Sequence, residues 1–370
     1  MRVAYFSKTS AMGPASRYRI YQFLPYLEHA DIQCAVYPLF ESAYFKLLEI
    51  QSKPVRVVAV AVYSGVRFLK RLWDLVAVKR PELLVVEGQL FPYCPPWVEK
   101  LLVYLGHRVV IEFDDAIYLT RFHERKLPQL LNLSASVIVG NRTLAEYASR
   151  YSSSVTIVPT VVDTERFAPN APSSTRTLSE RDSRITIVWI GLAYNAPYLE
   201  ALTSAIQRVQ QEFHARFRVI SSRPPKLKGI EVDFVPWEFR TEVERLQDCQ
   251  IGIMPLPDSE WAKGKCGLKL LQYMAVGMAA VASPIGVNRE IITPEENGLF
   301  ATSPDDWGRQ LGRLCRDASL RHQLGTAGRR TVEERYALNM WGPRLGDIYQ
   351  SIVYRRCEGA HSHNQLTGEA

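Results

Sequence analysis

Short runs of β-branched residues alternate with helical stretches along almost the whole chain of 370 residues. The predicted strands, in order, are 2–7, 32–40, 83–87, 108–113, 136–139, 155–158, 185–190, 217–221, 232–235, 251–254, 279–282 and 298–300. The predicted helices lie near 14–30, 55–79, 95–105, 124–133, 141–150, 197–213, 240–247, 268–276, 304–316 and 319–335. Such alternation indicates parallel sheets joined by right-handed crossovers. Because open α/β sheets bind ligands at the carboxyl ends of their strands, functional residues are expected in the loops that follow strands.

One segment, 164–184, interrupts this alternation near the middle of the chain. It is rich in Pro, Ser and Thr and poor in apolar residues, which is typical of an interdomain linker. The sequence therefore predicts an α/β fold of two Rossmann-like, doubly wound domains facing a cleft, 1–163 and 185–339. A helix over 340–353 is expected to return to the first domain, and 354–370 to form a flexible tail.

The charge balance favours anionic partners. Lys and Arg number 45 against 38 acidic residues, for a net charge of +7. The basic residues occur in scattered pairs and not in a long arm, so phosphates or anionic lipid headgroups fit better than nucleic acid. The six cysteines form no Cys-x-x-Cys pair and the N-terminal residues enter a strand at once, so reduced thiols and a cytoplasmic location are expected.

The most informative stretch runs from Gly264 to Gly277. Gly267 precedes a predicted helix, so backbone N–H groups there can approach an anion. The spacing of Lys265, Lys269 and Gln272 puts them on one helical stripe. Two ammonium groups and a helix N-terminus suit a diphosphate, and the amide suits ribose hydroxyls. The alternative is an ordinary amphipathic helix with exposed lysines.

This stretch, continued by residues 280–292 and 297–300, resembles the donor-binding region of glycosyltransferase family 4, the group 1 glycosyltransferases. The Lys-Cys-Gly…Lys…Gln-Tyr-Met version is similar to a subgroup of bacterial sugar transferases. The first half resembles the family more loosely, through its opening loop and residues 158–167. The resemblance implies a GT-B fold, a nucleotide-diphosphate sugar as donor, retention of anomeric configuration, and neither metal nor other cofactor.

Several positions depart from the family pattern. Members commonly carry two glutamates eight positions apart, and here these positions are Gly264 and Gln272. The usual Arg and Lys after the first strand of this half are replaced by a segment that begins with Gly191. In this reading Lys265 and Lys269 supply the missing positive charge and stabilise the leaving diphosphate. The predicted donor-binding residues are Gly13, Gly191, Lys265, Gly267, Lys269 and Gln272.

The loop after the first predicted strand contains a Gly13-Pro14 turn, with Pro at the first helical position. It lacks the Gly-x-Gly-x-x-Gly fingerprint of dinucleotide sites. In the resembled family a glycine loop here approaches the donor phosphate and the acceptor, which makes Gly13 a donor-side residue and Arg17 and Arg19 acceptor-side residues. The alternative is a strand–helix turn with solvated arginines.

Asp114 and Asp115 close the strand predicted over 108–113. Carboxylates there suit sugar hydroxyls or acid/base chemistry, so Asp114 is a catalytic candidate and Asp115 an acceptor-side one. The family often has a His-Asp-like pair at this place, and the alternative is helix capping by Asp115. The chain has no Asp-x-Asp triplet, so no metal site is expected. All seven histidines are expected to be solvated or hydrogen-bonded within the fold.

Together these features predict a retaining glycosyltransferase that acts in cell-surface polysaccharide synthesis, with a glycan or lipid-linked acceptor. The alternatives are a catalytically inactive nucleotide-sugar-binding subunit, motivated by Gly264 and Gln272, and a GT-B epimerase or phosphorylase.

A contact with an anionic membrane surface is expected from residues 67–73, which mix basic and large apolar side chains. The protein is then peripheral on the inner face of the membrane. The alternative is that Leu69, Leu72 and Trp73 are buried in the core.

Overall fold

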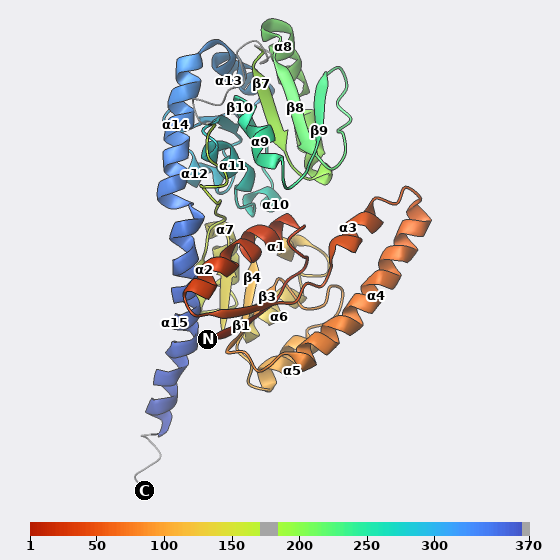
Figure 1. Cartoon of the computed structure of the whole chain (residues 1–370), viewed down its shortest axis with the longest axis vertical. Coiled ribbons are helices and arrows are strands. Elements are labelled where there is room, and N and C mark those ends of the chain that lie inside the picture. The colour runs from red at the N-terminus through yellow and green to blue at the C-terminus, as the bar shows by residue number, and fades with distance from the viewer. Residues whose placement is uncertain (171–183, 365–370) are drawn as a thin grey trace. The chain divides into compact units, whose positions relative to one another are not determined.

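The computed structural model describes residues 1–170 and 184–364, which form two compact units (Figure 1). Unit 1 consists of Met1–Thr160 and Leu338–Ala370, and unit 2 of Val161–Ala337. Each unit holds one six-stranded sheet in which every neighbouring pair is parallel. The predicted α/β fold with two doubly wound sheets is therefore confirmed.

The sheet of unit 1 has the order β2-β1-β3-β4-β5-β6. Its strands are β1 (Arg2–Phe6), β2 (Gln33–Val36), β3 (Leu83–Glu87), β4 (Val109–Phe113), β5 (Ser136–Val139) and β6 (Val155–Ile157). The chain leaves β1 toward β2 on one side and then returns to β3 on the other. The switch point of this sheet, where ligands bind in such folds, therefore lies between β1 and β3.

The helices of unit 1 are α1 (Pro14–Arg19), η1 (Tyr21–Phe23), α2 (Leu24–His29), α3 (Ser42–Leu48), α4 (Lys53–Ala77), α5 (Trp97–Tyr104), η2 (Ile117–Leu119), α6 (Lys126–Leu133), α7 (Arg142–Ala148) and α15 (Leu338–Asn364). The stretch predicted as one helix over 14–30 is three short pieces. Ile20 leaves the helical region of backbone conformation, with φ −126° and ψ −66°, so α1 ends there.

The sheet of unit 2 has the order β12-β11-β10-β7-β8-β9, so its switch point lies between β7 and β10. Its strands are β7 (Thr186–Ile190), β8 (Arg216–Ser221), β9 (Val232–Pro236), β10 (Ile251–Met254), β11 (Ala279–Ala282) and β12 (Leu299–Phe300). Its helices are η3 (Ala193–Leu202), α8 (Thr203–Phe213), α9 (Glu242–Gln247), α10 (Glu260–Lys263), α11 (Leu268–Ala275), α12 (Asn288–Ile291), α13 (Pro304–Arg316) and α14 (Ala318–Arg335).

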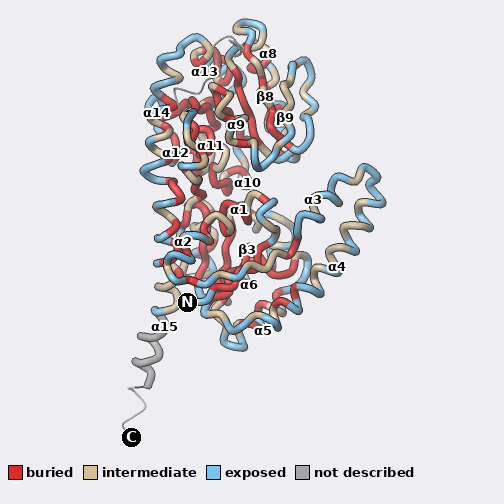
Figure 2. The backbone as a smooth tube through the Cα atoms, viewed as in Figure 1, coloured by how far each residue is buried: buried red, intermediate tan, exposed pale blue. Residues whose placement is uncertain are grey.

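The central strands of both sheets are buried along their whole length, as Figure 2 shows in red. Parallel sheets covered by helices on both faces have such near-continuous apolar strands, because neither face meets water. In unit 2 the core is built around Trp189 of β7, Phe217 of β8 and Leu311 of α13. This burial fixes the ends of β7 and β10, and with them the loops at the switch point.

Helix α15 belongs to unit 1 although it comes last in the chain. The hydroxyl groups of Tyr5 and Tyr349 lie 3.0 Å apart, and Arg108 donates to the Val353 carbonyl at 2.9 Å. The helix is longer than the 340–353 segment predicted from the sequence. Of the predicted tail, residues 365–370 lie outside the described residues.

The boundary between the units falls at Thr160 and Val161, before the predicted linker. Residues 161–170 are part of unit 2, where Arg329 donates to the carbonyl oxygens of Thr164 and Phe167 at 2.9 and 2.7 Å. The rest of the predicted linker, 171–183, lies outside the described residues.

Helix α4 contradicts one expectation. Leu69, Leu72 and Trp73 are exposed by 70%, 44% and 70%, so the alternative that placed them in the core is wrong. No helix of the described residues is long and apolar enough to cross a membrane.

Candidate functional site

The predicted donor residues other than Gly13 belong to unit 2. Gly191 directly follows β7, and the chain after β10 runs through α10 to the loop 264–267 and into α11. In doubly wound sheets, the connections from two such neighbouring strands leave on opposite sides of the sheet, and ligands bind at the carboxyl ends of these strands. Gly191 and the loop 264–267 therefore lie at the end of the sheet where ligands bind in doubly wound folds.

Gly191 lies against Lys269 and Trp189. A Cβ added at Gly191 would lie 2.7 Å from both Lys269 Cε and Trp189 Cζ2, closer than real Cβ contacts come. The Lys269 ammonium lies 5.4 Å from the centre of the Trp189 ring, within the range of a cation–π interaction. Trp189 is 1% exposed and anchored in the core, so only Gly lets the lysine stem pass here.

Lys265 precedes α11, so it is not on the helical stripe with Lys269 and Gln272 that the spacing predicts. The helix begins later because Gly267 has a φ of +74°, and a Cβ there would lie 2.6 Å from Ile291 Cδ1. Lys265 is 9% exposed, with its ammonium 5.6 Å from the centre of the Trp261 ring. The alternative of exposed lysines therefore fails for Lys265.

Gln272 lies beside a carboxylate that the sequence analysis did not select. Its Nε2 atom donates to Glu242 Oε1 at 3.4 Å, and both side chains are buried. Trp237 Nε1 donates to Glu242 Oε2 at 2.7 Å, and Arg166 donates to Oε1 at 3.3 Å. Glu242 is the first residue of α9 and follows β9, so a search of every segment that follows a predicted strand could have selected it. Gly264, the other departure from the glutamate pair, ends α10 and is buried.

In unit 1, Gly13 caps α1 as the Gly-Pro pair predicts, and it is packed against Thr9. A Cβ at Gly13 would lie 2.0 Å from Thr9 Oγ1, and this hydroxyl is held by Ser16 Oγ at 2.7 Å. The opening loop therefore needs glycine at this position because of close packing.

Glu87 holds the same loop from the end of β3, across the switch point of unit 1. Its Oε2 atom accepts from the Lys8 N–H at 2.8 Å and from the Ser16 hydroxyl at 2.6 Å. Burial raises the pKa of the Glu87 carboxyl, the two hydrogen bonds lower it, and the charge of Asp114 raises it again. Glu87 ends a predicted strand, which is the signal that could have selected it.

Arg17 and Arg19 are both buried, so the alternative of solvated arginines is wrong. Arg19 Nε lies 2.5 Å from Glu112 Oε1, and its Nη1 donates to the Val158 carbonyl at 2.7 Å. Arg17 donates to the Ala11 carbonyl at 3.3 Å. Arg19 thus ties α1 to β4 and to the end of β6, and Arg17 supports the opening loop.

Asp114 and Asp115 are partly buried after β4. The N-cap of η2 is Ala116, so Asp115 directly precedes the capping position of this short helix. Asp114 acts electrostatically on Glu87, because its charge is one of the causes that raise the pKa of the Glu87 carboxyl.

His123 is hydrogen-bonded on both ring nitrogens. Its Nδ1 atom lies 2.6 Å from Thr120 Oγ1, and its Nε2 atom lies 2.6 Å from Gln89 Nε2. Burial, followed by the charges of Lys8 and Lys126, lowers the pKa of His123 from 6.5 to about 4. The ring is therefore neutral at pH 7.

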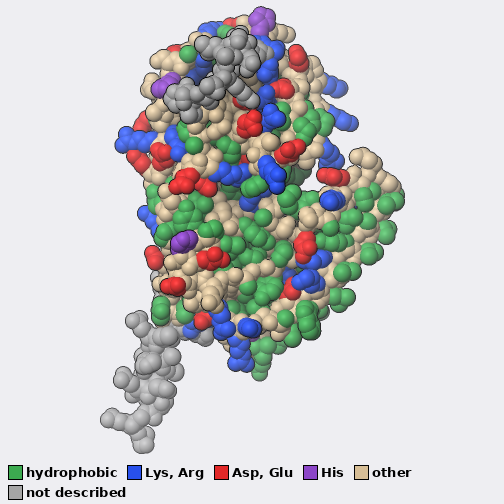
Figure 3. All heavy atoms as spheres, in the orientation of Figure 1, with side chains coloured by type: hydrophobic (Ala, Val, Ile, Leu, Met, Phe, Trp, Pro, Cys, Tyr) green, Lys and Arg blue, Asp and Glu red, His purple; other side chains and the backbone are tan. Residues whose placement is uncertain are grey.

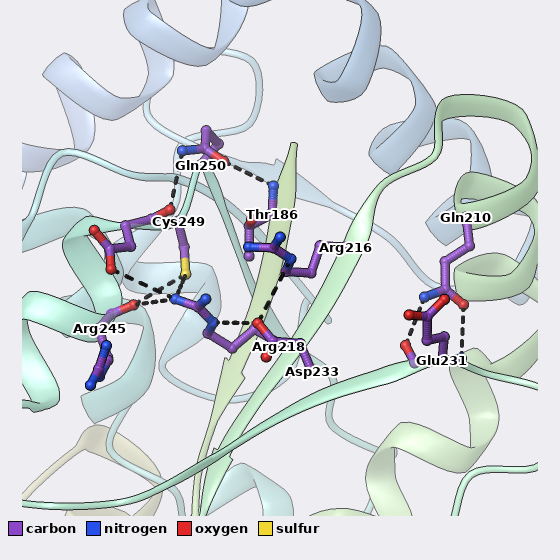
Figure 4. A network of polar contacts seen from close by, with 10 residues as sticks. Thr186, Gln210, Arg216, Arg218, Glu231, Asp233, Arg245, Cys249 and Gln250 are labelled. Atoms are coloured by element: carbon purple, nitrogen blue, oxygen red, sulfur yellow. Dashed lines mark hydrogen bonds and ion pairs between the residues drawn. The ribbon is translucent and has the colours of Figure 1, made fainter. Parts of the chain in front are cut away.

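A third polar cluster lies at the amino ends of the strands in unit 2 (Figure 4). Arg218 Nε lies 2.8 Å from Asp233 Oδ2, and the Thr186 N–H donates to Gln250 Oε1 at 2.8 Å. A cavity of about 360 Å³ opens beside Arg216 and Asp233. This cluster joins β7, β8 and β9 at the edge opposite the switch point, so we assign it a structural role. Among the described residues, no group of three or more His, Cys, Asp or Glu side chains could hold a metal ion.

Residues 184–317 match the family model for glycosyl transferases group 1. Two structures of similar fold are a glycosyltransferase from Rickettsia africae and sucrose-phosphate synthase from Thermosynechococcus elongatus. The first is 12% identical over 95% of this chain and 98% of that one, and the second 14% over 95% and 99%, each with a TM-score of 0.69. The chain has the GT-B fold.

A third GT-B structure of similar fold is Anabaena Alr3699/HepE in complex with UDP. It is 12% identical over 95% of this chain and all of that one, with a TM-score of 0.68. The same Anabaena protein is also known in complex with UDP-glucose. No curated protein sequence matches the chain.

Proposed function

We propose that the chain is a glycosyltransferase that moves a sugar from a nucleotide-diphosphate donor to a glycan or glycolipid acceptor. The observation that carries this proposal is the packing of Gly191, Lys269 and Trp189 at the switch point of unit 2. These residues lie inside the segment that matches the group 1 family model. The Anabaena protein binds UDP and UDP-glucose, which supports a uridine donor as the first to test.

The donor diphosphate is neutralised, in this proposal, by Lys265, Lys269 and the N-terminus of α11 at Gly267. Charge develops on the leaving phosphate oxygen as the glycosidic bond breaks, so positioned cations and N–H groups stabilise the transition state. Such charge neutralisation needs no divalent ion. Gln272, together with Glu242, is the candidate partner of the ribose hydroxyls.

The reaction is proposed to retain configuration, as the resemblance to family 4 implies. The bond between the anomeric carbon and the phosphate oxygen breaks, and the acceptor oxygen bonds to the same face of that carbon. The acceptor proton passes to the departing phosphate oxygen, so the nucleoside diphosphate leaves with it.

The acceptor side is assigned to the switch point of unit 1. Asp114 and Asp115, partly buried at the end of β4, are candidates for binding acceptor hydroxyls, and Arg17 supports the adjoining loop. We reassign Arg19 to loop support, because its guanidinium is engaged by Glu112 and Val158. A role in cell-surface polysaccharide synthesis follows if the acceptor is a lipid-linked glycan.

Thermal unfolding with a panel of UDP, GDP, ADP and CMP sugars tests the proposal, because a ligand that binds the folded state raises the melting temperature. We expect one nucleotide class to raise it and Lys269→Ala to diminish the shift. If no sugar nucleotide changes the melting temperature at millimolar concentration, the proposal is wrong.

A donor-binding subunit without catalysis is the second candidate, favoured by Gly264 where the family carries a glutamate. Release of free nucleotide from the donor that binds best, in the presence of acceptor lipid, rejects this candidate. The alternatives of an epimerase and a phosphorylase are distinguished from a glycosyltransferase by their products, which are an epimerised sugar nucleotide and a sugar phosphate, respectively.

A further inference from the structure

Helix α4 turns three of its charged residues, Arg67, Arg71 and Asp74, toward the protein. Arg67 donates to the Leu39 and Pro38 carbonyls at 2.8 and 2.7 Å, and Arg71 donates to the Ser7 carbonyl at 2.7 Å. Arg71 is 1% exposed, and its burial lowers its pKa to about 10. Asp74 is buried as well. In a helix that faces water these residue types belong on the outer surface.

The outward face of the same helix is apolar. Its large hydrophobic side chains are exposed by 44% to 81%: Val55, Val57, Val58, Val62, Val66, Leu69, Leu72, Trp73 and Val76. They run along the whole helix, which is 25 residues or about 38 Å long, and Figure 3 shows hydrophobic side chains along its outer edge. A contiguous exposed apolar surface of this extent marks an interaction site.

The charges beside this face are basic. All of α4 is described, and its exposed charged residues are Lys53 and Lys70, while its one acidic residue, Asp74, is buried and paired with Lys70 at 2.7 Å. Lys79 and Arg80 follow directly after the helix and are exposed. Basic groups at the rim of an apolar face complement anionic headgroups. Trp73 adds a side chain suited to the boundary between headgroups and acyl chains.

The apolar face is wider than a contact with one helix requires. Exposed hydrophobic residues occupy consecutive pairs, such as 57–58 and 72–73, as well as positions three or four apart. They cover about half of the circumference of α4, whereas a two-helix seam uses the narrow stripe of a heptad. A flat lipid surface covers such a face completely.

We propose that α4 is a membrane-docking helix that lies in the plane of an anionic lipid surface, with its valine, leucine and tryptophan side chains among the acyl chains. The basic residues expected to face the lipid from the sequence, Arg67 and Arg71, do not take part. Their place is inside unit 1, where they hold the helix on the protein. This proposal does not depend on glycosyl transfer.

The experiment is cosedimentation of the full chain with vesicles, without any sugar nucleotide. We expect binding to vesicles of phosphatidylglycerol and phosphatidylcholine in equal parts, and weaker binding to phosphatidylcholine alone. The double variant Leu69→Ser/Trp73→Ser should lower the partition coefficient at least about tenfold, because two large side chains no longer enter the lipid. Both positions are exposed, so the melting temperature should stay unchanged.

A matched control is Trp97→Ser/Leu101→Ser on α5, whose side chains are exposed by 73% and 54%. This variant should bind vesicles as the unaltered chain does. The proposal is overturned if the chain does not sediment with the anionic vesicles, or if the α4 variant binds them unchanged. It is also overturned if analytical ultracentrifugation shows a dimer that the α4 variant dissociates, because the face then belongs to a second copy.

Discussion

Replacing Lys269 with alanine removes one ammonium group from the switch point of unit 2 and leaves the buried face of α11 in place. Lys269 is partly exposed, and its stem passes Gly191 and Trp189. A charge-assisted hydrogen bond to a phosphate contributes about 1.5–3 kcal/mol. Its loss corresponds to a fall of about tenfold to a hundredfold in donor affinity or turnover. If negative charge grows at this place in the transition state, kcat falls more than affinity.

Lys265 needs a different substitution, because it is buried beside Trp261. Truncation to alanine would remove packing as well as charge and would lower stability. Lys265→Met keeps most of the stem and removes only the ammonium group, so the expected loss of turnover, again about tenfold to a hundredfold, reports on charge. The double variant should lose less than the product of the two single effects if both lysines hold one diphosphate.

The measurements are calorimetric donor affinity, steady-state turnover and the melting temperature of each variant. Lys263→Ala is the control, since its ammonium lies 2.7 Å from Glu260 on the surface of α10, and it should leave all three unchanged. Full activity and unaltered donor affinity in both Lys269→Ala and Lys265→Met would refute the assignment of the diphosphate to this site.

Four further outcomes follow from the structure. Gly191→Ala should lower both donor affinity and the melting temperature, because the new Cβ would lie 2.7 Å from Lys269 Cε; unchanged values would show that the packing yields easily. The pKa of His123 is lowered to about 4, so between pH 6.5 and 4 the unfolded chain binds more protons than the folded chain. The free energy of unfolding therefore falls as the pH falls through this window. His123→Gln should make the free energy of unfolding, measured by urea titration, less dependent on pH there. Glu112→Gln leaves the buried Arg19 charge without its carboxylate and should lower the free energy of unfolding by about 3–5 kcal/mol in denaturant titrations. A change near zero would contradict the pairing. Turnover should persist in excess chelator. A complete loss of turnover in chelator that magnesium or manganese restores would argue against the lysine mechanism.

The strands were predictable because each is a short apolar run that is buried in a parallel sheet, and such runs stand out from sequence alone. The break of the 14–30 stretch at Ile20 was not predictable, because the residue that leaves the helical conformation there is not a glycine. For residues 67–73 of α4, the sequence left two interpretations open, a contact with a membrane surface and burial in the core. Periodicity reports that a helix has two faces, but only the partners of Arg67 and Arg71 show which face is inward.

The candidate donor site was predicted from the glycines and lysines that cluster in sequence around Gly267, and from the resemblance to family 4 in the case of Gly191. Glu87 and Glu242 were missed because their neighbours come from distant segments: Lys8 lies 79 positions from Glu87, and Arg166 lies 76 positions from Glu242. The position of each residue at or after the end of a strand marks it as a candidate, but its burial and its partners are tertiary properties that composition and spacing do not give. The start of α11 at Leu268 agrees with the predicted helix, but Lys265 was wrongly placed on its stripe, because the positive φ of Gly267 separates Lys265 from the helix.

Helix α15 makes unit 1 a domain of two separate chain segments, with unit 2 inserted between them. During synthesis, residues 161–337 emerge in one piece and can close their own sheet. Unit 1 has its six strands by residue 157 but must wait for Tyr349 to reach Tyr5, 344 positions earlier. Domains usually fold from the N-terminus onward as the ribosome releases them. Here the first domain to begin is the last to be completed.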